Sequence, residues 1–172
     1  MNELDEIWSK MLSQALANAK ASGRHDVADY LTLKATNDAI RRASTAWLFD
    51  TAVELASEAN RNNASISIER EDQHNFAFRG SNMVGSLLRV RRGVRCLTIE
   101  AGWTRTPTDG FMRGGALAFA RITHLGMAKQ NAELVLQNSN GHPIWYILRD
   151  DKAVDPFKSV ALLSHFRVFL DG

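Results

Sequence analysis

The hydrophobic period of this sequence changes near residue 64, from that of a helix to that of a strand. Before this point apolar residues recur three or four positions apart, whereas in Ser65-Ile66-Ser67-Ile68 they alternate with polar ones. A period of 3.6 indicates an amphipathic helix, and a period of 2 indicates a half-buried strand. Successive strands without crossover helices pair mainly antiparallel. We therefore predict an α+β fold with N-terminal helices, an antiparallel sheet and a C-terminal helix.

The helical part, residues 1–63, contains two predicted helices. The first has one apolar stripe and ends at Ser22-Gly23, where glycine can take the left-handed conformation that closes helices. Residues 26–34 fit either a short helix or an extended segment. A longer helix is expected to start near Thr36-Asn37-Asp38, because these residue types cap helix N-termini, and to stop at the turn-forming Asn60-Arg61-Asn62-Asn63.

About five to seven short strands are expected over residues 64–150. The clearest pair is a hairpin of residues 83–91 and 94–100, joined at Arg92-Gly93. A C-terminal helix over residues 155–170 is predicted to pack on the sheet, with Asp155 as its N-cap and Pro156 in its first turn. No repeat or linker divides the chain, so we expect a single domain over 1–172. The other strands are expected at 65–70, 76–78, 116–123, 132–137 and 144–149.

The composition excludes several classes of protein. With 45% hydrophobic and 23% charged residues, the chain is too apolar to be intrinsically disordered. A single cysteine, Cys96, excludes an intramolecular disulfide and a cysteine-rich zinc site. The acidic start does not resemble a secretory signal, and no segment approaches the roughly 20 apolar residues of a membrane span. We expect a cytoplasmic protein that does not associate with membranes.

The net charge of +2 conceals an uneven distribution. Residues 61–125 carry ten arginines, no lysine and five acidic groups. Such a block can be a solvated sheet face that discourages edge-to-edge aggregation, or it can contact nucleic acid, with Phe76 or Phe78 stacking on bases. The near-neutral charge and the core-like spacing of these aromatics disfavour nucleic acid, and strand parity does not place all the arginines on one face. The candidate contacts are Arg79, Arg89, Arg91, Arg92 and Arg95.

Signatures of catalysis are weak. Gly80 and Gly85 have the spacing of a phosphate-binding loop, but the lysine that would reach the phosphates is absent. Cys96 and His124 could pair as nucleophile and base, although a buried cysteine beside a surface histidine is the expected arrangement. Asp150-Asp151 could bind a divalent cation, but two aspartates more often form a turn. We predict no metal site and no cofactor.

Residues 102–115 form the best candidate site. This stretch has no hydrophobic period and approaches the length at which loops are often functional. Its two arginines offer forked donors, Asp109 can orient one of them, and its glycines allow close backbone approach. The set suits a small anion, a phosphate or a peptide carboxylate. Alternatively, the segment is a long connection in which Trp103 packs into the core and Pro107 and Asp109-Gly110 make turns. The candidate site residues are Trp103, Arg105, Asp109, Phe111 and Arg113.

The favoured function is therefore a non-enzymatic binding or protein-interaction module. Its partner would be an unidentified protein or a small anionic ligand bound at loop 102–115, and the protein could form a homo-oligomer, for example a dimer. One alternative is a nucleic-acid-binding protein that uses the arginine-rich hairpin 79–95. Another is a small enzyme of unassigned reaction class that uses Asp109 or a histidine for proton transfer.

Overall fold

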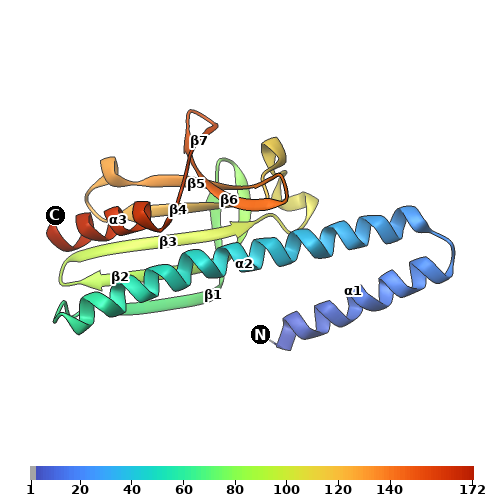
Figure 1. Cartoon of the computed structure of the whole chain (residues 1–172), viewed down its shortest axis with the longest axis horizontal. Helices are drawn as coiled ribbons and strands as arrows, with labels where there is room; N and C mark the ends of the chain where they lie inside the picture. The colour runs from blue at the N-terminus through green and yellow to red at the C-terminus, as the bar shows by residue number, and fades with distance from the viewer. Residues whose placement is uncertain (1–2) are drawn as a thin grey trace. The chain divides into compact units, whose positions relative to one another are not determined.

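The protein has an α+β fold, as the change of period predicts. The computed structural model describes residues 3–172 and contains two N-terminal helices, a seven-stranded antiparallel sheet and a C-terminal helix (Figure 1). The chain separates into two compact units, Met1–Arg42 and Ala43–Gly172.

The first unit is helical. Helix α1 spans Glu3–Ala21 and α2 begins at His25. Gly23 lies between them with φ of 71°, and Arg24 N–H donates to the Ala19 carbonyl at 2.9 Å. This is the left-handed closure predicted for Ser22-Gly23. Large apolar side chains of this unit, such as Ile7, Met11 and Leu33, are exposed.

Helix α2 is continuous over His25–Arg61, so the predicted start near Thr36-Asn37-Asp38 is wrong. The threonines bond backward within the helix instead of capping it: the Thr32 hydroxyl donates to the Ala28 carbonyl, and Thr36 to Thr32, both at 2.9 Å. The predicted C-terminal end is confirmed. There the Asn60 amide joins helix to sheet by donating to the Ile66 carbonyl and accepting from the Ile66 N–H.

The second unit contains the remainder of α2 and a sheet whose strands follow one another in sequence order, β1 to β7. Every neighbouring pair is antiparallel, and the predicted turn at Gly93 joins β2 to β3. The strands are β1 (Ser67–Phe78), β2 (Ser81–Arg92), β3 (Arg95–Trp103), β4 (Ala118–His124), β5 (Ala132–Ser139), β6 (His142–Arg149) and β7 (Lys152–Pro156), followed by helix α3 (Ser159–Asp171).

Two predicted boundaries differ from the structure. Segments 65–70 and 76–78 belong to one strand, β1, interrupted by a register shift between Glu71 and His74. The C-terminal helix begins at Ser159 and not at Asp155, because residues 152–156 form an edge strand whose Pro156 lies opposite Tyr146. An edge strand tolerates proline, since one side of it needs no donor.

One face of the sheet carries the main core. Helix α3 and residues 43–61 of α2 cover this face, where Phe49, Phe166 and Phe169 are almost fully buried. The Trp145 indole N–H crosses the core to donate to the Ser44 carbonyl of α2 at 3.0 Å. The fully buried strand residues of this face are Leu88, Val90, Leu97, Ile99, Ala101, Ala118, Ala120, Ile122, Leu134 and Leu136.

The opposite face carries a second, smaller core because the sheet bends sharply. Gly85 and Gly102 lie opposite each other in β2 and β3. A Cβ on Gly85 would lie 2.5 Å from Gly102 Cα, and one on Gly102 would lie 2.7 Å from the Val84 carbonyl oxygen. Only glycines permit this approach. Beyond the bend, a second cluster buries Phe76, Phe78, Met83, Ala116, Phe119 and Val135.

Candidate functional site

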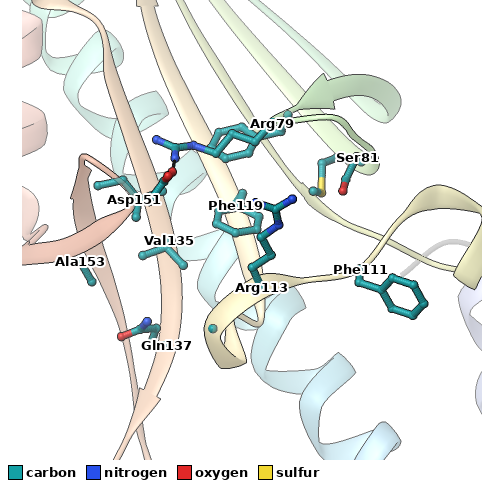
Figure 2. A pocket seen from close by; sticks show the side chains of 13 residues that line it. Arg79, Ser81, Phe111, Arg113, Phe119, Val135, Gln137, Asp151 and Ala153 are labelled. Carbon is teal, nitrogen blue, oxygen red and sulfur yellow. Dashed lines mark ion pairs between the residues drawn. The ribbon is translucent and has the colours of Figure 1, made fainter.

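A cavity of about 460 Å³ lies beside this second core (Figure 2). Seven of its thirteen lining residues are apolar, among them the buried Phe119, Val135 and Met83. Charged and polar groups, including Arg79, Arg113 and Asp151, complete the lining. Ligand cavities in proteins commonly have 300–1,000 Å³, apolar walls and a few convergent polar groups. The volume and lining fit a small molecule.

Ion pairs bridge the bent β1–β2 hairpin to the strands that form the rest of the cavity. Arg79, in the turn between β1 and β2, donates to Glu133 of β5 at 2.6 Å and pairs with Asp151 before β7 (Figure 2). Arg121 of β4 donates to the Ala77 carbonyl at 3.1 Å. Arg79 has a φ of 49°, in the left-handed region. These contacts couple the shape of the cavity to the position of the hairpin.

Three of the five candidate residues in loop 102–115 maintain the structure of the loop. Trp103 ends β3 and is buried. The Arg105 guanidinium lies 3.8 Å from the centre of the Trp103 ring, a cation–π contact, and donates to the Val84 carbonyl. The Asp109 carboxylate accepts from the backbone N–H groups of Arg105 and Thr106 and from the Thr106 hydroxyl. It therefore closes a turn.

The hydrogen bonds to Asp109 also affect its ionisation. The Thr106 hydroxyl, followed by the backbone amides of Thr106 and Arg105, lowers the pKa of the Asp109 carboxyl below its usual range. A general acid or base that works near neutral pH needs a pKa raised toward that range. The lowered pKa thus favours a structural role for Asp109 over the proton-transfer role.

The other two candidates, Phe111 and Arg113, line the cavity. In Figure 2 the Arg113 side chain points toward Phe119, whereas the exposed Phe111 ring points away from it at the rim. Among residues 6–172, whose side chains the structure describes, the Arg113 guanidinium has no ion pair or hydrogen bond. Gly114 and Gly115, with φ of 65° and 70°, form the tight turn after it. Arg113 is thus a cation available to a ligand.

The hairpin arginines separate onto the two faces of the sheet. Arg89 pairs with Glu69 at 3.0 Å on the outer face, together with Arg91. Arg92 and Arg95 instead donate to the last carbonyls of α3, Arg95 reaching Leu170 at 2.8 Å. Cations at a helix C-terminus satisfy its free carbonyls and its dipole. Phe76 and Phe78, the two rings predicted to stack on bases, are buried and do not lie exposed beside these arginines.

Cys96 and His124 do not form a catalytic pair. His124 lies opposite Leu97, on the inner face, whereas Cys96 lies opposite Arg91 on the outer face. The expected burial is also reversed, since His124 is buried and Cys96 is partly exposed. The His124 Nε2 instead contacts the His165 Nδ1 of α3 at 2.8 Å. Burial lowers the pKa of both imidazoles, that of His165 to about 4 with a further contribution from His124.

Phe119, Val135 and Met83, which form much of the apolar lining of the cavity, are not among the site residues predicted from the sequence. Phe119 and Val135 lie on the face opposite Ala120 and Leu134, so β4 and β5 are buried on both sides. The uninterrupted apolar run of residues 116–120 carries this signal, because a strand buried on both faces loses its alternation. Asp150 and Asp151 form the turn between β6 and β7, each with positive φ.

Other kinds of site are not found in the same residues. No group of three or more histidine, cysteine or acidic side chains among residues 6–172 is arranged to hold a metal ion. None of the described helices combines the length and apolarity needed to cross a membrane. No protein-family model, characterised protein or solved structure shows significant similarity to this chain. Any functional assignment therefore depends on the residues themselves.

Proposed function

We propose that the protein is a non-enzymatic binding protein whose ligand is a small apolar carboxylate held in the 460 Å³ cavity. The observation that supports this proposal is the Arg113 guanidinium at a partly apolar cavity, without an ion pair or hydrogen bond to residues 6–172. The apolar part of the ligand would lie against Phe119 and Val135, and its carboxylate would accept from Arg113.

Charge supports an anion over a neutral or cationic ligand. Of the charged groups that line the cavity, Arg79 and Asp151 neutralise each other in an ion pair, which leaves the charge of Arg113 uncompensated. A guanidinium matches a carboxylate in shape and can donate two parallel hydrogen bonds to it. A peptide carboxylate offers the same group, but the volume favours a small molecule.

The test uses decanoate and the fluorescent reporter 8-anilinonaphthalene-1-sulfonate, which is itself an apolar anion. Decanoate should displace the reporter at least ten times more effectively than decan-1-ol, which has the same chain without the charge. A hydrogen bond to a charged group contributes about 1.5–3 kcal/mol. The Arg113→Ala variant should therefore bind decanoate roughly 10- to 100-fold more weakly.

Two further variants control this experiment. Arg167→Ala removes an exposed arginine of α3 outside the cavity and should leave decanoate binding unchanged. Ala153→Phe places a ring in the cavity and should abolish binding of decanoate while the protein stays folded, as judged by circular dichroism. Equal displacement by decanoate and decan-1-ol, or unchanged binding in Arg113→Ala, would refute the proposal.

A further inference from the structure

A second hollow, separate from the cavity above, lies on the outer face at the turn between β2 and β3. It has a volume of about 350 Å³. Its residues come from three adjacent strands, because Arg91 lies opposite Cys96, Arg89 opposite Thr98, and Thr98 opposite Thr123. The strand register therefore places the guanidinium groups of Arg89 and Arg91 beside the hydroxyls of Thr98 and Thr123 and the thiol of Cys96.

The charge of this hollow has one sign. No acidic residue lines it, whereas Arg89, Arg91 and Arg95 do. Arg95 donates to the end of α3, and Arg89 is paired with Glu69 outside the lining. Arg91 is exposed, and its guanidinium has no ion pair or hydrogen bond to any residue from 6 to 172. The Arg91 guanidinium is thus available to bind an anion, and the Arg89 guanidinium lies beside it.

The remaining lining suits an anion with several acceptor oxygens. The hydroxyls of Thr98 and Thr123 can each donate one hydrogen bond, and arginine donates through a planar fork. Two exposed apolar side chains, Val94 and Leu125, border the hollow. No aromatic residue lines it, so it lacks the stacking surface that binds nucleobases.

We propose that this hollow binds a tetrahedral oxyanion of the phosphate class, held by Arg91 and Arg89 and by the hydroxyls of Thr98 and Thr123. The oxyanion comes either as free phosphate or as the head of a phosphate monoester. In the second case the ester group lies against Val94 and Leu125. The site is independent of the carboxylate cavity, since the two linings share no residue.

Cys96, the only cysteine of the chain, provides a probe inside the hollow. Alkylation of its thiol can be followed by mass spectrometry, with iodoacetate as an anionic reagent and iodoacetamide as a neutral one. At constant ionic strength, inorganic phosphate should slow alkylation at least threefold and saturably, whereas chloride should not. The arginines should also raise the ratio of the iodoacetate rate to the iodoacetamide rate above that of free cysteine.

Two arginine variants test whether Arg91 is responsible for the protection of Cys96 by phosphate. In Arg91→Ala, phosphate should no longer protect Cys96 and the rate ratio should fall, whereas Arg167→Ala, outside the hollow, should behave as the wild type. Phenyl phosphate distinguishes the two sources. Protection at a lower concentration than inorganic phosphate assigns the site to a monoester, and equal protection assigns it to free phosphate.

A second measurement does not depend on thiol reactivity. Titration of the ¹⁵N-labelled protein with inorganic phosphate should shift the backbone amide signals of residues 89–98 and 123 and leave those around Arg113 unchanged. If phosphate neither protects Cys96 beyond the effect of chloride nor shifts these signals, the proposal is wrong. Protection that persists in Arg91→Ala would equally overturn it.

Discussion

Gly85 is the residue on which the bend of the sheet most directly depends. In the Gly85→Ala variant the new Cβ would overlap the Ala101 carbonyl oxygen and lie 2.5 Å from Gly102 Cα. Both neighbours belong to the backbone of the paired strand, so no side-chain rotation can relieve the overlap. Strands β2 and β3 would have to separate by about 1 Å to restore an ordinary carbon–carbon distance of roughly 3.5 Å.

The cost of this separation can be approximated from its parts. Overpacking that moves the backbone typically costs 1–3 kcal/mol, and weakening one or two ladder hydrogen bonds adds about 1 kcal/mol each. We therefore expect the free energy of unfolding to fall by about 2–5 kcal/mol, with a midpoint near 3.5 kcal/mol. For a chain of this length, 1 kcal/mol shifts the melting temperature by roughly 2–4 °C, so the expected decrease is about 10 °C.

The Gly93→Ala variant is the matched control, measured beside Gly85→Ala by urea denaturation. Gly93 has a φ of 59°, and a Cβ added there would meet no atom within 4 Å, so the variant would incur only the cost of left-handed backbone, about 1–2 kcal/mol. Because the bend builds the cavity, Gly85→Ala should also weaken decanoate binding. If Gly85→Ala is no less stable than Gly93→Ala, close approach does not determine the bend.

Two further predictions concern the histidine pair and the loop. Because the folded-state pKa of His165 is lowered to about 4, the unfolded chain binds more protons as the pH falls from about 6.5 to 4. His165 alone should then lower the free energy of unfolding by at most about 1.4 kcal/mol per pH unit, and urea denaturation of His165→Gln should show a shallower decrease. Asp109→Ala should accelerate hydrogen exchange at the Arg105 and Thr106 amides, measured by NMR, while exchange at the Leu97 amide stays unchanged.

The order of the elements could be predicted from periodicity, because an element that buries one face repeats its apolar residues with the period of a helix or of a strand. The errors arose where one residue type serves two structures. Thr36 is a common N-cap residue, yet its hydroxyl bonds to Thr32 within the helix. Pro156 fits the first turn of a helix as well as it fits an edge strand, and its pairing with Tyr146 selects the strand. Such choices depend on tertiary partners that local sequence does not specify.

The candidate site was predicted only in part, for a related reason. The mixture of arginines, an aspartate and aromatic residues in loop 102–115 predicts a binding site. Of these residues, Arg105 and Asp109 stabilise the loop itself, whereas Phe111 and Arg113 line the cavity. The distinction depends on the bend at Gly85, which brings the β1–β2 hairpin against β4 to β7. The only sign of this bend in the sequence is the pair of glycines Gly85 and Gly102. Their position opposite each other follows from the register of β2 and β3, which the sequence alone does not give.

The bend also explains why the arginine-rich middle of the chain does not form a continuous basic surface. Folding the β1–β2 hairpin back uses Arg79 to join Glu133 and Asp151, while the β2–β3 turn directs Arg92 and Arg95 to the end of α3. The guanidinium groups of Arg113 and Arg91 form no ion pair or hydrogen bond to residues 6–172, and they lie at two separate hollows. The high arginine content is thus mainly structural. Function is best sought at Arg113 and Arg91, whose charges the described fold leaves uncompensated.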